Sequence, residues 1–236
     1  PLLRPMAIIL GFMNGLMSIT MATFVLFAQE VLGVSAFTFA ILGTGGAIGG
    51  LAATFLASKV SERIGSGPSL YMVLGSSIVT SLVTGIASHW AIAWAMFTVG
   101  TFAAVLWNVI TVSLRQTIIP DQLLGRVNSV YRFFAWGMIP IGSAIGGLLV
   151  VGSETAFSRE MSLRMPWLVV AAAWVVLFIY AAPKLTTAKI EAAREAGIAA
   201  KRAAGEVPSE DEVATDAISE AGVAGAPPPI DEDSDG

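Results

Sequence analysis

Residues 115–132 read RQTIIPDQLLGRVNSVYR, a polar stretch with three arginines between two long apolar runs. A helix needs about 20 mostly apolar residues to cross the hydrocarbon core of a bilayer, and both neighbouring runs are long enough to do so. The stretch is therefore a connection at one face of a membrane. Cytoplasmic connections carry the excess of Lys and Arg. Its arginines, Arg115, Arg126 and Arg132, thus predict that it faces the cytoplasm.

The same stretch predicts a short surface helix that leads directly into the next span. Pro120 suits the first turn of a helix, because its missing N–H has no partner there. Asp121 follows, where a carboxylate meets the positive end of the helix dipole. Gly125 allows the chain to bend or pack closely before the span begins.

The composition of the chain also indicates a membrane protein. Of its 236 residues, 55% are hydrophobic and 13% are charged, whereas soluble domains are about 25% charged. The mean hydropathy is +0.76. The charges are unevenly divided, since residues 1–183 hold eight basic and five acidic groups and residues 184–236 hold five basic and twelve acidic groups. The net negative charge therefore belongs to the C-terminal part.

Six apolar runs predict six membrane-spanning helices, at residues 6–28, 37–57, 70–87, 90–114, 133–151 and 167–182. We also expect a short helix on the outer surface at residues 158–164, in which Glu160 and Arg164 are four apart and form a favourable pair, with Pro166 beginning the last span. If the chain starts inside, Arg159 and Arg164 are the only basic residues in outer loops. This asymmetry predicts a protein of the cell membrane with both ends of this chain in the cytoplasm.

The chain divides into three parts. Residues 1–183 form the six-helix membrane unit, and residues 184–204 are alanine-rich with mixed charge and can form a helix beside the membrane. Residues 205–236 are acidic and rich in Pro, Gly and Ser, a composition that predicts a disordered tail. Because the sequence begins with proline rather than methionine, we expect further residues upstream.

Enzymatic chemistry is not indicated. No Asp, Glu, Lys, Arg or His lies deep within a predicted span, and the single histidine, His89, lies at a predicted outer turn. The chain has no motif of a serine hydrolase, a zinc protease or a P-loop ATPase. It has no cysteine and hence no thiolate metal site. We expect no enzyme, no metal or other cofactor, and no nucleic-acid partner.

Small residues spaced four apart predict close helix packing, which fits both a static bundle and the sliding surfaces of a transporter. The pairs are Gly11 and Gly15, Gly45 and Gly49, Gly46 and Gly50, and Gly142 and Gly146. Polar residues within spans leave two interpretations open. Asn14 and Asn108 either make hydrogen bonds between helices or line a cavity that contacts substrate. Three deep tryptophans, Trp107, Trp136 and Trp174, are expected to pack between helices.

Residues 57–67, ASKVSERIGSG, resemble the cytoplasmic loop signature of the major facilitator superfamily, G-x-x-x-D-R-x-G-R-K. Arg63 and Gly65 align with the arginine and second glycine of the signature, and Glu62 replaces its aspartate. Ser58 replaces the first glycine and Ser66-Gly67 the final basic pair, a degeneration usual in the second-half copy. Residues 115–129 resemble the loop between helices ten and eleven in the exporter branch that includes enterobactin and macrolide efflux proteins.

The resemblance implies an all-α membrane fold in which this chain is helices seven to twelve, built as two inverted three-helix repeats. It implies that an N-terminal six-helix half is absent from this sequence. The implied function is secondary transport by alternating access in a lipid bilayer, with outward export of a drug- or siderophore-like small molecule.

The resemblance also implies roles for particular residues. The cytoplasmic motifs would act as gate elements whose charges pair with the opposite half: Glu62, Arg63, Gly65, Arg115, Asp121, Gly125, Arg126 and Arg132. The candidates to line the substrate cavity are Asn14, Gln29, Trp107 and Asn108. The alternative hypothesis is a complete six-span channel, or a membrane scaffold whose acidic tail recruits a partner.

Overall fold

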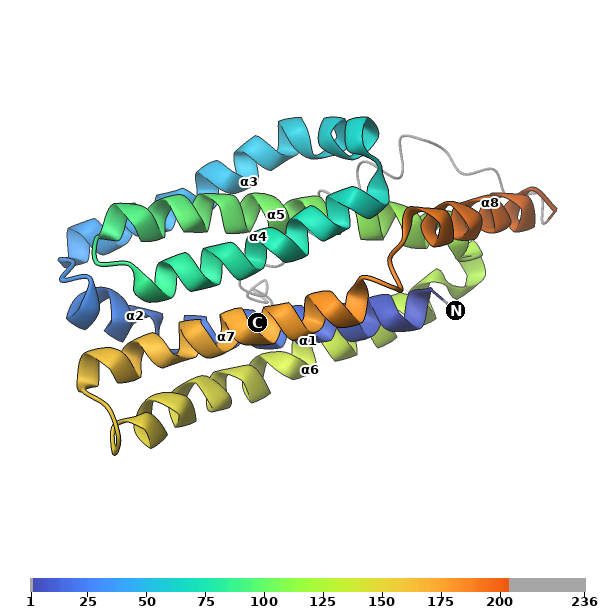
Figure 1. The fold of residues 1–236 in the computed structure, drawn as a ribbon. Coiled ribbons are helices and arrows are strands. Elements are labelled where there is room, and N and C mark those ends of the chain that lie inside the picture. The colour runs from blue at the N-terminus through green and yellow to red at the C-terminus, as the bar shows by residue number, and fades with distance from the viewer. Residues whose placement is uncertain (1, 204–236) are drawn as a thin grey trace, which may run out of the picture.

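The computed structural model describes residues 2–203, and over these residues the chain is helical with no β-strand (Figure 1). Six helices are long and apolar enough to cross a membrane, as predicted. They are α1 (Leu3–Met21), α3 (Ala36–Ile64), α4 (Ser66–Ile86), α5 (Trp90–Ile118), α6 (Asp121–Ser153) and α7 (Arg159–Ala181). The shorter elements are α2 (Phe24–Leu26), the π-helix η1 (Phe27–Val31) and α8 (Thr187–Ala203).

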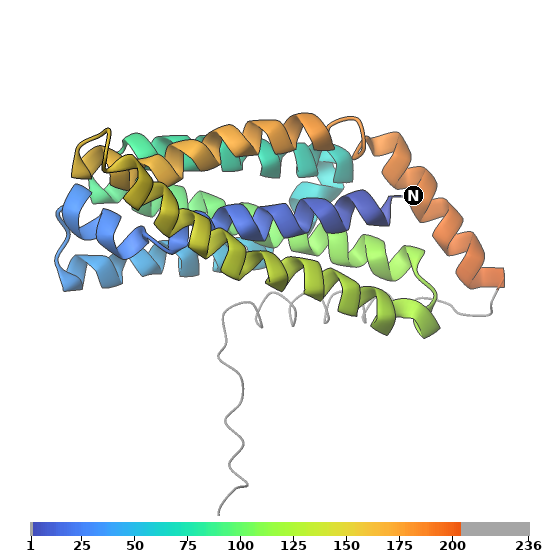
Figure 2. The ribbon, with the colours of Figure 1, turned by 90° about the horizontal axis from the view of Figure 1, so that it is seen from below.

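The long helices lie side by side in alternating directions, so their connections gather at two ends (Figures 1 and 2). One end holds the start of α1, the α3–α4 and α5–α6 connections and α8. We call it the basic end, because it carries Arg4, Lys59, Arg63, Arg126 and Arg132. The opposite end holds α2, η1 and the α4–α5 and α6–α7 connections.

The contacts between helices follow a reciprocal pattern. Helix α1 packs against α6, α3 against α5, and α4 against α7. If α1, α3 and α4 form one triplet and α5, α6 and α7 a second, the first helix of each triplet contacts the second helix of the other, and the two third helices contact each other. Two inverted three-helix repeats are expected to pack in this way.

Glycines allow two of these contacts to be close. A Cβ atom at Gly146 or Gly142 of α6 would overlap the carbonyl of Ile19 or Gly15 in α1. At Gly49 of α3 it would overlap the Thr98 carbonyl of α5. The close packing predicted for these pairs is confirmed. Gly46 and Gly50 are different, because a Cβ there would meet only the Thr101 side chain at 3.4 and 3.8 Å.

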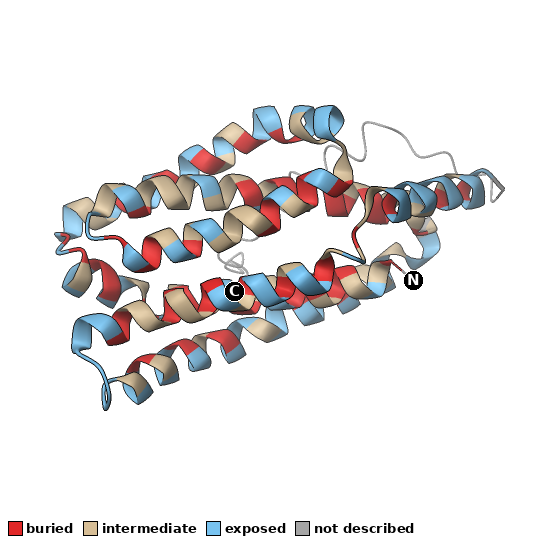
Figure 3. Ribbon diagram, in the orientation of Figure 1, coloured by how far each residue is buried: buried red, intermediate tan, exposed pale blue. Residues whose placement is uncertain are grey.

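The core lies between the helices, and the outward faces are apolar but exposed (Figure 3). Trp107, with 1% of its surface exposed, and Trp174 are buried as predicted. Trp136 is 59% exposed, so the prediction that it packs within this bundle is wrong. Exposed side chains such as Phe133, Leu148 and Ile179 give the helices the apolar outer surface that lipid requires.

The first span departs from the prediction of one helix over residues 6–28. Helix α1 ends at Met21, and the backbone of Thr23 (φ −111°, ψ 2°) leaves the helical region before α2 and η1 continue the chain. The Thr20 hydroxyl donates to the Met17 carbonyl at 2.9 Å and that of Thr23 to the Thr20 carbonyl at 3.4 Å. Such local bonds compete with the backbone ladder. The apolar run gave no sign of this break.

The predicted surface helices are not separate elements. Helix α7 begins at Arg159 and continues through Pro166, so the expected start of the last span at Pro166 is wrong. Helix α6 begins directly after Pro120 and continues through Gly125, where a Cβ would meet open space. Gly125 therefore permits no close contact within the described residues.

The segment after the last span forms α8, as predicted for residues 184–204. The disorder predicted for residues 205–236 concerns residues outside the range that the structure describes.

Candidate gating and substrate-binding regions

The α3–α4 joint positions the first predicted motif at the basic end. Glu62 and Arg63 lie exposed in the last turn of α3. Gly65 is the one residue between α3 and α4, with φ 87°. Its N–H donates to the Ser61 carbonyl at 3.0 Å, and its carbonyl accepts from the Ser69 N–H at 3.2 Å. Glycine adopts a positive φ without steric cost, so this residue permits the sharp joint that presents the charged turn.

The predicted gate charges are available to a partner. Glu62, Arg63, Arg126 and Arg132 are exposed, and none forms an ion pair with another residue of the range 2–203. Asp121 begins α6, but its side chain is not among those that the structure describes. The basic end therefore presents exposed charges on two helices, α3 and α6, that form no ion pair within the described bundle.

Arg115 differs from the other predicted gate residues because it is only 6% exposed. Its guanidinium carbon lies 4.5 Å from the centroid of the Tyr131 ring, a cation–π contact between α5 and α6. The Tyr131 hydroxyl donates to the Leu3 carbonyl at 2.6 Å. These contacts tie α5, α6 and α1 together, so Arg115 has a packing role at the basic end.

Sequence reasoning missed Tyr131, although it lies inside the polar stretch from Arg115 to Arg132. Its partners come from two other helices, and no local spacing indicates them. A similar bond occurs on α4, where the Tyr71 hydroxyl donates to the Ala182 carbonyl at the end of α7 at 2.7 Å.

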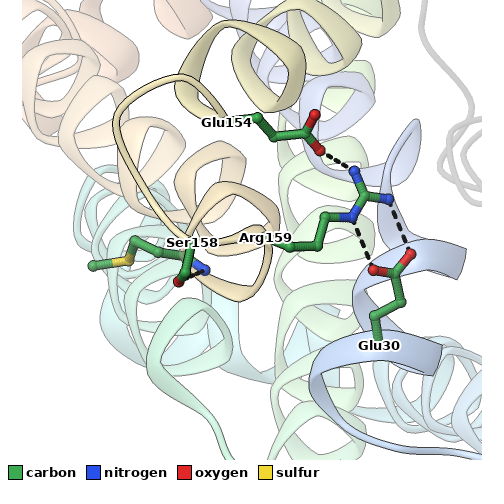
Figure 4. A network of polar contacts seen from close by, with 5 residues as sticks. Glu30, Glu154, Ser158 and Arg159 are labelled. Carbon is green, nitrogen blue, oxygen red and sulfur yellow. Dashed lines mark hydrogen bonds and ion pairs between the residues drawn. The ribbon is translucent and has the colours of Figure 1, made fainter.

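An ion-pair network joins three elements at the opposite end (Figure 4). Arg159 donates from Nε to Glu30 Oε2 at 2.8 Å and from Nη2 to Glu30 Oε1 at 2.9 Å, and its Nη1 contacts Glu154. The two-pronged contact matches the planar guanidinium to the carboxylate. The hydrogen bond from Arg159 lowers the pKa of Glu30 below its ordinary value of 4.5. The network attaches η1 to the α6–α7 connection.

Arg164 anchors the same end. The predicted pair with Glu160 is confirmed at 3.0 Å. Arg164 also donates from Nη1 to the carbonyls of Gly85 and Ala87, each at 2.8 Å. These carbonyls belong to the end of α4, where helical acceptors lack partners. Arg164 is therefore a cap for α4 as well as a surface ion pair.

An aromatic cluster lies at the same end of the bundle as the Arg159 and Arg164 contacts. Phe24 of α2 contacts Phe39 of α3, Phe97 of α5 and Trp167 of α7 with ring centroids 5.4, 4.8 and 6.2 Å apart. Phe27 of η1 contacts Trp167 at 5.5 Å. The segment after the break in α1 thus packs against three other helices at the opposite end.

The four predicted cavity residues do not form one cluster. Gln29 is exposed in η1 at the opposite end, whereas Asn14 and Asn108 are half-buried within α1 and α5. Asn14 donates from Nδ2 to Leu10 of its own helix at 3.1 Å, so its amide does not make the inter-helix bond considered above. Asn108 makes no side-chain hydrogen bond within residues 2–203. Trp107 is buried in the core between helices.

The described residues offer no group of three or more His, Cys, Asp or Glu side chains that could hold a metal ion. The polar features described for residues 2–203 are charged helix ends, an ion-pair network at the opposite end, hydrogen bonds that join helices, and isolated amides. Such features suit binding and conformational coupling.

Comparison with known proteins gives one clear result. A family model described as Major Facilitator Superfamily matches residues 3–221, a range that includes all six long helices and α8. No curated protein gives a significant match to the chain.

Proposed function

The chain belongs to the Major Facilitator Superfamily, and from this premise we propose that it is the second half of an exporter that moves a small molecule out of the cell by alternating access. The family consists of membrane transporters rather than enzymes, so the general class of the protein is a multi-pass transporter of small molecules. The proposed substrate is drug- or siderophore-like, because residues 115–129 resemble the loop of enterobactin and macrolide exporters. Membership in this family disfavours a channel or a scaffold.

The observation that carries the proposal is the set of exposed, unneutralised charges at the basic end. Glu62 and Arg63 on α3 and Arg126 and Arg132 on α6 lie on the second helix of each three-helix unit. A second six-helix half would meet them with opposite charges and hold the cytoplasmic side closed. Breaking these pairs would open the inner side, and substrate would bind between the halves near the middle of the membrane.

The proposed binding surface uses the half-buried amides. Asn14 and Asn108 lie within spans, where an amide needs either a partner or water. We place them, together with Gln29 nearer the outer side, along the substrate path. Trp107 would support this wall from behind, because its ring is buried among neighbouring helices.

The gate can be tested in the full-length protein with Arg126→Ala. Loss of one charge pair of about 1 kcal/mol should reduce efflux about fivefold while membrane insertion is unchanged. Arg126→Lys keeps the charge and should retain most activity. Arg194→Ala is the matched control, because Arg194 is an exposed arginine of α8 outside both motifs. Unchanged efflux in Arg126→Ala would remove Arg126 from the gate.

The half-protein proposal is tested by the coding sequence upstream of Pro1. Six further spans with a closer copy of G-x-x-x-D-R-x-G-R-K are expected there. A start codon immediately before Pro1 would contradict this arrangement.

A further inference from the structure

Helix α8 and the basic end of the bundle enclose a groove of about 700 Å³. Its walls are Leu2, Leu3 and Pro5 beside the start of α1, Ile118 at the end of α5, and the alanine-rich face of α8. The charged residues that line it are Lys184 and Lys189, and no carboxylate lines it within residues 2–203. The groove thus combines apolar walls with positive charge.

Helix α8 contacts the bundle closely at its first residue and again in its second half. A Cβ at Gly197 would lie 2.6 Å from both Ile118 Cα and the Thr117 carbonyl oxygen of α5. At Gly67 it would lie 2.8 Å from the Thr187 nitrogen at the start of α8. Ile190, between these contacts, is buried in the core. Because α8 is fixed against the bundle, a ligand would meet a preformed site and would not have to order the helix.

The two lysines lie just beyond the end of α7, where the chain leaves the apolar span. Lys184 donates from Nζ to the Tyr180 carbonyl at 3.1 Å and lies 3.7 Å from the Tyr180 ring centroid. Lys189 donates from Nζ to the Pro183 carbonyl at 2.6 Å. An ammonium group has three N–H donors. Each lysine therefore keeps N–H donors for an anion.

We propose that this groove binds an anionic phospholipid of the surrounding leaflet. An acyl chain would lie along the leucine, proline and alanine walls, and the phosphate would accept hydrogen bonds from Lys184 and Lys189. Basic pockets between helices at a membrane face attract anionic headgroups. The inference depends on the position of the chain in a membrane and not on the direction of transport.

Native mass spectrometry of the full chain in detergent can test the site. Phosphatidylglycerol should be retained more strongly than phosphatidylcholine with the same acyl chains. Lys184→Gln and Lys189→Gln should each weaken phosphatidylglycerol retention about fivefold, since one basic residue near an anionic surface contributes on that order. Arg194→Gln is the matched control, because it removes the same charge from α8 outside the groove and should retain wild-type binding.

A second pair of variants tests the apolar wall. Ala196 lines the groove and is exposed, so Ala196→Phe should fill it and lower retention of both lipids without disturbing the fold. Ala199→Phe, exposed on α8 but outside the groove, should have no effect. Glycerol phosphate, which lacks acyl chains, should not compete. Equal retention of the two lipids, competition by glycerol phosphate, or equal losses in the variants and their controls would overturn the proposal.

Discussion

Gly65 alone connects α3 to α4, and it does so with a positive φ of 87°. With ψ 157° as well, the backbone lies in a region that is essentially restricted to glycine, and a residue with a side chain is disfavoured there by about 1–3 kcal/mol. The charges of Glu62 and Arg63 lie within the preceding turn, so strain at Gly65 would also move the proposed gate. Gly65 thus determines both the backbone conformation of the α3–α4 joint and the position of the proposed gate charges.

We predict that Gly65→Ala lowers the free energy of unfolding by about 1–3 kcal/mol. Gly75→Ala is the control, because Gly75 lies inside α4 with open space around a Cβ, and alanine there should be neutral or stabilising by up to about 1 kcal/mol. Unfolding of the purified protein in mixed detergent micelles measures both. Equal effects of the two substitutions would show that the joint does not require glycine at position 65.

The Glu30–Arg159 pair should give a pH-dependent stability. The pKa of Glu30 is lowered in the folded state by the hydrogen bond from Arg159. Its contribution is therefore fully present above pH 4.5 and is lost as pH falls through the lowered pKa. The Tm of the wild type should exceed that of Arg159→Gln at neutral pH, and the difference should shrink below about pH 4. A difference that does not change over this pH range would contradict the assignment.

The residue pattern predicted which helix ends are charged but not which charges meet. The local pair Glu160–Arg164 followed from helical spacing. Glu30 and Arg159 lie 129 residues apart, and Arg115 and Tyr131 lie on different helices. Their contacts arise from the tertiary arrangement of the helices, which the spacing of residues along one helix does not contain.

At the scale of elements, the two close helix contacts use nearly the same six residues. Residues 45–50 of α3 read GGAIGG, and residues 142–147 of α6 read GSAIGG. Each motif lies on the second helix of its unit and packs against the first helix of the other. The spacing of the glycines predicted close packing, but the repeat that relates α3 to α6 is recognisable only once the helix contacts are known.

Gly146 and Gly147 provide a test of this packing within one motif. A Cβ at Gly146 would overlap the Ile19 carbonyl, whereas a Cβ at Gly147 would meet nothing within 4 Å. Gly146→Leu should separate α6 from α1 and lower stability by about 1–3 kcal/mol, the usual cost of overpacking. Gly147→Leu should cost less than about 0.5 kcal/mol. Unfolding in mixed micelles distinguishes the two variants. A larger effect of Gly147→Leu would contradict the finding that Gly146 lies on the face of α6 that contacts α1.

The number and order of the spans were predictable because each requires a long apolar run. The residues at which the helices begin and end were less predictable. The break before Thr23 lies within a continuous apolar run, and local hydroxyl bonds accompany it. Pro166 was expected to begin a helix, yet α7 passes through it because Ser158 caps the helix earlier, with its hydroxyl accepting from the Met161 N–H at 3.4 Å.

At the scale of the whole molecule, the segregation of charge predicts how the chain lies in the membrane. The basic end should face the cytoplasm, and His89, at the α4–α5 turn, should face outward. Because the chain has no native cysteine, His89→Cys should react with an impermeant maleimide in intact cells. Gln122→Cys, at the start of α6, should react only after permeabilisation. The reverse pattern would invert the orientation and remove the proposed cytoplasmic gate.

Within the described part of the chain, three side chains join helices by donating to main-chain oxygens. Tyr71 reaches Ala182, Tyr131 reaches Leu3, and Arg164 reaches Gly85 and Ala87. Since every amino acid supplies that oxygen, these bonds place no requirement on the side chains of the receiving positions, whereas the donors cannot change without losing the bond. Evolutionary substitutions at the two sides of each joint should therefore be uncorrelated, and maps of coupled substitutions would overlook the very bonds that fasten these helices together.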